Sequence, residues 1–512
     1  MKKFVFLILI IFSVEGFSQG IVRYQPPSFT DTIRLQKIKA TQEVVDKLYK
    51  EYAERFHFPA FVFGVVGDGQ LLYTGSTGYT DVAKKIPATT TSAFRIASMT
   101  KSFTALAILQ LRDAGKLRLD DPVYTYIPEM KKLHYLTTDA PPITVRHLMT
   151  HAAGFPEDNP WGDRQLADTD KELLQLIEND PFFSNVAGIT YEYSNLGFAL
   201  LGKIVTNVSG KPYQQFIAEN IFKPLGMNHT YWEYTKVPAT QLAHGYRWQN
   251  EQWMEEPLLH DGAYGAMGGL ITSIEDFAKY MALHMAAWPP RNGAESVVLK
   301  RSSLREMHQP WNFNFLNTQY HNPDGRPCAI ATSYSYGLRW TKDCDGITYI
   351  DHSGGLPGFG SQWRFLPEYG IGVLCFANRT YAPISVINAK VLDTILKLSQ
   401  LKPRALPPSA ILQKRKEELI KILPDWKGAE NSRLFAENFF LDNPIDSLRK
   451  QATSLFTKAG KIVQVHEIVP QNQLRGAFVM EGEKKNIEIF FTLTPENPPL
   501  IQQLNMREVP KF

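Results

Sequence analysis

The chain has 512 residues, of which 44% are hydrophobic and 21% are charged, and its 55 lysines and arginines nearly balance 51 aspartates and glutamates. This composition is typical of a globular protein and argues against extensive disorder. The net charge is only +4, and no run of five like charges provides the basic surface that a phosphate backbone would need, so we expect no nucleic-acid partner.

The first residues have the pattern of a secretory signal peptide. Two lysines precede the apolar run at 4–14, and the small residues Gly16 and Ser18 follow it. We therefore predict a signal peptide over 1–18 and an exported protein, periplasmic or secreted. No later stretch reaches the roughly 18 uninterrupted apolar residues typical of a transmembrane helix, so we expect no membrane span.

The next 380 or so residues alternate between strand-like and helix-like patterns. Apolar spacing predicts a helix over 35–56, and the apolar runs AFVFGVV and QLLYTG around Gly67-Asp68-Gly69 predict a β-hairpin. From about 98 to 290 the apolar spacing is mostly helical. Strands return from Tyr336, in YGLRWTK, ITYIDHS, SQWRFLP and GIGVLCFAN, and a helix over 384–401 follows.

A domain boundary is predicted where prolines interrupt this pattern, at Lys402-Pro403 and Pro407-Pro408. Beyond it, helical stretches precede four alternating, strand-like runs, an order that indicates a separate α+β module, possible forms being a cystatin-like or NTF2-like cone. The helical stretches are 411–422, 430–438 and 445–458. The predicted domains are 35–400 and 409–512, with a linker at 401–408.

Three cysteines are too few, and odd in number, for a disulfide scaffold. Cys375, in the run GVLCFAN, is expected to be a buried small hydrophobic residue. Cys328 and Cys344 lie in polar loops and could pair, although a bridge between them is not our default expectation.

The strongest nucleophile candidate is Ser98, in the sequence Ser98-Met99-Thr100-Lys101. Ser98 opens an apolar helix, and Lys101 follows one turn later on the same face, so the two side chains are neighbours. A serine hydroxyl needs a base to become a nucleophile, and lysine can act as one where burial favours its neutral form. The same spacing occurs at Ser399–Lys402 and Ser447–Lys450, where a helix end and an amphipathic helix are the simpler interpretations.

Two further motifs provide polar groups that a reaction could use. Tyr193-Ser194-Asn195 stands where an apolar helix begins, so a phenol and an amide could face a cleft. His352-Ser353-Gly354-Gly355 ends one candidate strand before another, and its glycines would let a substrate approach the backbone closely. Neither motif is specific alone, because Tyr320-His321-Asn322 and His260-Asp261-Gly262 match the same short patterns.

Together and in this order, the three motifs resemble the serine β-lactamase and penicillin-binding-protein family, specifically its class C β-lactamase, D-aminopeptidase and esterase branch. The similarity extends over about residues 35–400. Its most characteristic strings are AFRIASMTKSFTALAI, VRHLMTHAAGF, YSNLGFALLGKIVTNVSGKPYQQFIAENIFKPLGM and HSGGLPGFGSQWRFLPEYGIGVLCFANR. The resemblance implies an α/β sandwich with an antiparallel sheet and a helical insertion.

The resemblance also implies a reaction, acyl transfer to water through a serine ester. Ser98 would be the acylated nucleophile, Lys101 its activating partner, and Tyr193 the general base or proton shuttle. Asn195 would hold the substrate's amide and help to order Lys101. The oxyanion hole would consist of the N–H groups of Ser98 and Gly355.

The third motif departs from the β-lactamases proper, in which it begins with a lysine that binds the substrate carboxylate. Here it begins with His352, beside Gly354 in the expected substrate-binding strand. A mostly neutral imidazole is a weaker carboxylate anchor than an ammonium. Without a permanent cation at this edge, esters or neutral peptides are expected to be better substrates than penicillins.

Other chemistries find no support in the sequence. His147 and His151 have the spacing of a zinc pair, but Leu148 stands where the motif H-E-x-x-H needs glutamate. Nucleotide-binding loops and the G-x-S-x-G elbow are absent from the sequence, so we expect no cofactor and no metal. The expected ligand is a small-molecule or peptide substrate. The alternative is a catalytically silent protein that binds peptidoglycan-like peptides.

Overall fold

The computed structural model describes residues 24–159 and 161–511. The predicted signal peptide lies outside the described residues. The chain divides into two compact units, one over Phe29–Arg404 and one that contains the residues from Ala405 onward. Within the described part of the chain, no helix is both long enough and apolar enough to cross a bilayer.

A nine-stranded sheet, antiparallel throughout, forms the centre of the first unit. Its two parts come from opposite ends of the unit, since Phe63 of β1 pairs with Cys375 of β13. In spatial order the strands are β3 (Ile86–Pro87), β2 (Gln70–Asp81), β1 (Ala60–Gly67), β13 (Ile371–Ala377), β12 (Phe359–Leu366), β11 (Thr348–Leu356), β10 (Arg339–Lys342), β9 (Ile330–Tyr334) and β8 (Asn312–Asn317).

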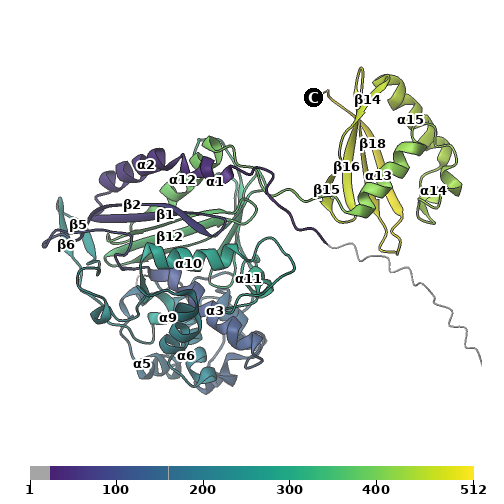
Figure 1. The fold of residues 1–512 in the computed structure, drawn as a ribbon. Coiled ribbons are helices and arrows are strands. Elements are labelled where there is room, and N and C mark those ends of the chain that lie inside the picture. Colours follow the sequence, from purple (N-terminus) through teal and green to yellow (C-terminus); the bar gives the residue numbers. More distant parts are fainter. Residues whose placement is uncertain (1–23, 160, 512) are drawn as a thin grey trace, which may run out of the picture. The chain divides into compact units, whose positions relative to one another are not determined.

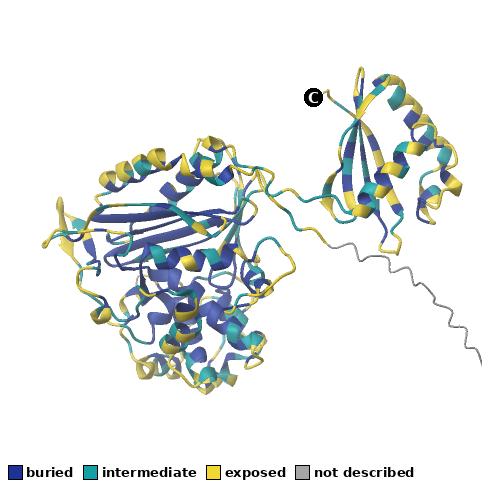
Figure 2. Cartoon of the chain, in the orientation of Figure 1, coloured by how far each residue is buried: buried dark blue, intermediate teal, exposed yellow. Residues whose placement is uncertain are grey.

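Helices cover both faces of this sheet (Figure 1). The first face carries α1 (Arg34–Lys39), α2 (Gln42–Arg55) and α12 (Ile384–Leu398), whose apolar residues form one core with β1 and β13. The second face carries a larger core from the helical insertion. Figure 2 shows that the central strands and much of the helical region beneath them are buried. The expected sandwich of an antiparallel sheet with a helical insertion is therefore confirmed.

The insertion consists of helices and two small two-stranded sheets. The small sheets pair β4 (Phe94–Arg95) with β7 (Ile271–Thr272) and β5 (Tyr246–Gln249) with β6 (Gln252–Glu255). Its α-helices are α3 (Thr100–Asp113), α4 (Val145–Met149), α5 (Asp170–Glu178), α6 (Asn195–Ser209), α7 (Tyr213–Ile217), α8 (Lys223–Leu225), α9 (Gly265–Gly268), α10 (Ile274–Met285) and α11 (Arg301–Met307).

Most predicted elements of the first unit are present, with differences at their ends. The predicted hairpin forms β1 and β2, and its turn needs the positive φ angles of Asp68 and Gly69. The helix expected over 35–56 is interrupted after Lys39, so it forms α1 and α2. The strands β8 and β9 were not expected.

The second unit packs helices on one face of a five-stranded antiparallel sheet (Figure 1). Its helices are α13 (Ala410–Ile422), α14 (Phe439–Asp442) and α15 (Ile445–Ala459). Its strands are β14 (Ile462–Val465), β15 (Val469–Asn472), β16 (Arg475–Gly482), β17 (Asn486–Leu493) and β18 (Ile501–Val509). Along β16 and β17 buried and half-buried residues alternate, as expected for a sheet covered on one side.

The prediction of a helix over 430–438 is wrong. Most of that segment is extended or turned, because the backbone N–H of Ala436 donates to the carbonyl oxygen of Ile501, and Phe435 and Ile501 form a β-bridge. Pairing with β18 therefore replaces helical hydrogen bonds here.

Candidate active site

Ser98 lies at a sharp turn on the second face of the sheet. It belongs to a single turn of 3-10 helix, η1 (Ala97–Met99), which leads into α3. Ala97 has a φ of +50°, a conformation uncommon for a residue with a side chain. The hydroxyl of Ser361, on β12, donates to the carbonyl oxygen of Ile96 at 2.7 Å. The sheet thus holds the turn on which the nucleophile stands.

Lys101 has a hydrogen-bond acceptor for each of its three ammonium protons. Its Nζ lies 3.0 Å from Ser98 Oγ, 2.7 Å from Asn195 Oδ1 and 2.9 Å from the carbonyl oxygen of Met267. The side chain is 0% exposed, so water cannot replace any of these contacts. If the lysine loses a proton, its free electron pair can accept the hydroxyl proton of Ser98.

The surroundings of Lys101 favour the neutral amine. Burial lowers the pKa of Lys101 well below its ordinary value, and the nearby carboxylates of Asp163 and Asp158 oppose this shift only in part. The cation of Arg339 lowers the pKa of Lys101 further. A base that is neutral nearer to physiological pH is what serine activation requires.

The start of α6 is fixed by its N-terminal hydrogen bonds. The carboxylate of Asp158 accepts hydrogen bonds from the backbone N–H groups of Asn195 and Leu196, at 2.6 and 2.8 Å. The hydroxyl of Ser194 accepts from the N–H of Gly197 at 3.3 Å. These bonds satisfy donors that a helix leaves free at its start, and they hold Asn195 against Lys101.

Tyr193 lies beside both the nucleophile and the lysine. Its ring centroid is 5.0 Å from Lys101 Nζ, and its side chain is almost fully buried. Burial raises the pKa of Tyr193, and a hydrogen bond with Ser98 opposes this rise. A neutral phenol beside Ser98 can donate a proton to a leaving group.

His352 does not occupy the position expected of a substrate-binding residue. It is 0% exposed, its Nδ1 donates to the carbonyl oxygen of Ser353 at 2.6 Å, and its Nε2 accepts from the hydroxyl of Tyr334 at 2.8 Å. Burial lowers the pKa of His352, so the imidazole is neutral. With both nitrogens in use inside the protein, it cannot anchor a carboxylate in the cleft.

The two glycines of the third motif face different surroundings. A Cβ on Gly354 would lie 2.2 Å from the carbonyl oxygen of Ile96, so Gly354 lets β11 approach the η1 turn rather than a substrate. Gly355 lines the cavity beside Ser98, and a Cβ there would lie 2.8 Å from the ring of Tyr381.

These groups meet at a cavity of about 370 Å³. It is lined by Ser98, Glu157, Asn159, Asp163, Tyr191, Tyr193, Arg339, Ser353, Gly355 and Tyr381. The sequence did not identify Arg339 or Asp163 as parts of the site. The exposed Arg339 donates to Ser353 Oγ at 3.3 Å, so the expected lack of a permanent cation at this edge is wrong.

The other matches to the short motifs lie elsewhere. Ser399 is buried at the end of α12, and its hydroxyl has no hydrogen-bond partner within the described residues. Ser447 lies on α15 in the second unit. Neither serine borders the cavity of Ser98. Only the first match therefore combines a serine, a buried lysine and a tyrosine.

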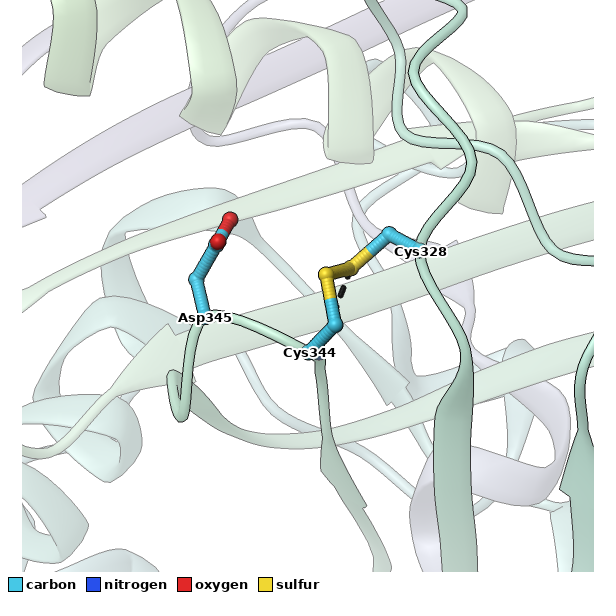
Figure 3. A group of neighbouring side chains, drawn as sticks. All are labelled: Cys328, Cys344 and Asp345. Carbon is cyan, nitrogen blue, oxygen red and sulfur yellow. Dashed lines mark hydrogen bonds between the residues drawn. A yellow bond between two sulfur atoms is a disulfide. The ribbon is translucent and has the colours of Figure 1, made fainter.

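Cys328 and Cys344 form a disulfide that ties the loop before β9 to the turn between β10 and β11. Asp345 lies beside it, and within the described residues these three form the only group of three or more side chains that could together hold a metal ion (Figure 3). Both sulfurs are bonded to each other, so neither can provide the thiolate that a metal would bind. Cys375 is buried, as expected.

Comparison with known proteins agrees with this arrangement. The family model "Beta-lactamase" matches residues 45–394. Protein flp of Staphylococcus aureus (strain MW2) is 27% identical over 363 residues, which are 69% of this chain and 67% of that protein. Beta-lactamase-like protein 2 of Dictyostelium discoideum is 28% identical over 360 residues, 68% of this chain and 62% of that protein.

Two solved structures share the fold. The octameric penicillin-binding protein homologue from Pyrococcus abyssi superposes with a TM-score of 0.59 at 22% identity, covering 91% of this chain and 99% of its own. The penicillin binding protein from Bacillus halodurans has a TM-score of 0.53 at 24% identity, covering 69% of this chain and 98% of its own. At these identities the likeness concerns the fold.

Proposed function

The chain belongs to the beta-lactamase family, and from this premise we propose that it is an exported serine hydrolase that forms an acyl-enzyme on Ser98. The observation that carries the proposal is the 3.0 Å contact between Ser98 Oγ and Lys101 Nζ in a site from which water is excluded around the lysine. A nucleophile within hydrogen-bond reach of a buried base is the arrangement that covalent catalysis needs.

In the proposed acylation step, neutral Lys101 takes the hydroxyl proton of Ser98 while Oγ bonds to the carbonyl carbon of the substrate. The oxyanion that forms is bound by the N–H groups of Ser98 and Gly355. When the carbonyl re-forms, the leaving group departs with the hydroxyl proton of Tyr193, which regains a proton from protonated Lys101. Water then hydrolyses the serine ester by the reverse set of proton transfers.

Ester, peptide and amide bonds are all compatible with this step, and the cavity favours substrates with an anionic group. Arg339 and Ser353 lie side by side at its edge, and together they offer a guanidinium and a hydroxyl to a carboxylate. The preference for neutral substrates was expected because His352 replaces a lysine. That expectation no longer holds, because Arg339 provides a cation at the edge of the cavity.

The alternative, a silent binding protein, explains less of the site. A protein that only binds peptides has no need for a lysine that is fully buried and held against a serine hydroxyl. Burying such an ammonium is costly, and the cost is understandable if the amine takes part in the reaction.

The test is covalent labelling of the whole protein. We expect a fluorophosphonate to label the wild type at Ser98, and Ser98→Ala to lose both the label and at least about 10³-fold of any hydrolysis. Ser399→Ala is the matched control, since it removes the serine of another S-x-x-K match and should keep both. Intact-mass measurement after exposure to penicillin, a D-Ala-D-Ala peptide and a p-nitrophenyl ester identifies the acyl groups accepted. Labelling that survives in Ser98→Ala would refute the proposal.

A further inference from the structure

Asp163 is an unusual member of the cavity wall. It lies in a turn of 3-10 helix, η4 (Gly162–Arg164), and only 1% of its surface is exposed. Its Oδ2 accepts a hydrogen bond from the hydroxyl of Tyr381 at 2.9 Å, but its Oδ1 is buried and has no partner within the described residues. A buried carboxylate oxygen without a partner destabilises the folded protein, so its presence requires an explanation.

The cations of the site do not supply the missing partner. All three protons of a protonated Lys101 already have acceptors, on Ser98, Asn195 and Met267. Arg339 instead donates to the hydroxyl of Ser353. Asp163 therefore forms no ion pair within the described part of the chain, although it borders the cavity.

Packing on two sides fixes the position of Asp163. A Cβ on Gly162 would lie 2.9 Å from Cβ of Asn195, so the η4 turn rests directly on the start of α6. On its other side, Tyr381 contacts the Gly355 position of β11. Asp163 thus stands near the oxyanion end of the cleft and close to the nucleophile.

Arg339 and Asp163, which carry opposite charges, lie toward the two ends of the segment 353–355 of β11. Arg339 binds Ser353, whereas Tyr381, the partner of Asp163, borders Gly355. Two residues of extended strand separate these positions by about 7 Å. The exposed carboxylate of Glu157 adds a second negative charge to the wall of the cavity. The cavity is therefore suited to a ligand with a cation at one end.

On the basis of the acyl-enzyme chemistry proposed above, we propose that Asp163 is a specificity-determining residue that binds an ammonium group of the acyl donor. The favoured substrates then carry a free amine close to the carbonyl that Ser98 attacks. An ammonium would give Oδ1 the charge-assisted hydrogen bond that it lacks. An N-acetylated donor would leave the carboxylate unpaired and would also need to fit an extra group.

The charges around Asp163 determine the pH range in which it can bind an ammonium group. Burial raises the pKa of Asp163, the hydrogen bond from Tyr381 and the charge of Lys101 oppose this rise, and Asp158 and Glu157 add to it. Recognition requires an ionised Asp163 and a protonated amine. The preference for a free amine is therefore expected above the raised pKa of Asp163 and below the pKa of the substrate amine, which is about 8 for an α-amine.

The experiment compares the 4-nitroanilides and phenyl esters of D- and L-alanine with their N-acetylated forms, using the full chain. We expect wild-type kcat/KM to favour the free amine by at least about 10-fold for the preferred enantiomer. Asp163→Asn should remove most of this preference, because it should lower kcat/KM for the free amine by a much larger factor than for the N-acetylated substrate. The charge-matched control is Asp170→Asn, which removes an exposed carboxylate of α5 and should keep the wild-type ratio.

Two results would overturn the assignment. An equal loss on both substrates in Asp163→Asn would show that the carboxylate acts only through Lys101. Equal hydrolysis of N-acetylated and free-amine substrates by the wild type would also contradict the role of Asp163. This comparison needs no variant, so the proposal can be tested even if Asp163→Asn does not fold. Fluorophosphonate labelling separates the two proposals, because failure to label Ser98 refutes the hydrolase, whereas labelling with equal substrate use refutes only the role of Asp163.

Discussion

Lys101 combines complete burial with a full set of hydrogen-bond acceptors. Its proposed role as the base requires that it can lose a proton. Lys101→Arg keeps a positive charge but cannot supply a neutral amine, so acylation of Ser98 should fall by about 10²–10⁴-fold. The second-order rate of fluorophosphonate inactivation measures this loss. Because arginine is also larger, Lys101→Met serves as a second variant, and near wild-type rates in either would show that the lysine is not the base.

The pH dependence of acylation is a second prediction for the same residue. Only the deprotonated fraction of Lys101 can accept the Ser98 proton, so the rate should rise with pH as this fraction grows. Because burial lowers the pKa of Lys101, the rise should be complete well below the ordinary lysine pKa of about 10.4. Inactivation rates measured from pH 5 to pH 10 give the midpoint. A midpoint near 10.4 would mean that the lysine is solvated and its pKa unshifted.

At the scale of elements, the active site depends on close contact between β11 and the η1 turn. A Cβ on Gly354 would lie 2.2 Å from the carbonyl oxygen of Ile96 and 2.4 Å from Ser361 Oγ. Gly354→Ala must therefore displace the turn that carries Ser98. We expect a loss of at least about 10² in acylation rate, with a stability cost of about 1–3 kcal/mol.

Gly197→Ala is the matched control for this prediction. Gly197 lies in the first turn of α6, and its nearest neighbour would be 3.7 Å from the added Cβ, an ordinary contact. This substitution should leave acylation unchanged and should slightly stabilise the helix. Inactivation rates and thermal unfolding of the two variants test the contrast. Equal activity in both would mean that the turn tolerates movement and that β11 does not position Ser98.

At the scale of the whole molecule, each unit has its own hydrophobic core. The first unit has two large cores, one on each face of its sheet, and the second unit has a separate core around β16, β17 and β18. We therefore expect two calorimetric unfolding transitions. Phe491→Ala, in the buried face of β17, should cost the second unit about 3–5 kcal/mol and lower one transition only.

The control for this prediction lies next to it on the same strand. Phe490 points to the opposite face of β17 and is only half-buried, so Phe490→Ala should have a smaller effect. Labelling of Ser98 should be unchanged in both variants, since neither alters the first unit. A single transition that shifts as a whole with Phe491→Ala would show that the two units unfold together.

Local interactions explain why the sequence by itself determined much of this protein. Ser98 and Lys101 are three residues apart at a helix start, so helical geometry alone makes them neighbours. The hairpin of β1 and β2, the helices α3, α6 and α10, and the strands β10 to β13 follow from apolar periodicity. The order of the motifs was enough to identify the family and the sandwich fold.

Only the tertiary structure decided which distant residues share the cavity and what their neighbours do. Arg339 reaches it through the register of β10 on β11, and Asp163 through the packing of η4 on α6. His352 lost its expected role because Tyr334, on another strand, occupies its second nitrogen. Likewise, pairing with β18 overrode the helix expected at 430–438, and folding brought Cys328 within bonding distance of Cys344. Strand register and long-range packing depend on contacts between segments far apart in the chain, which local periodicity does not encode.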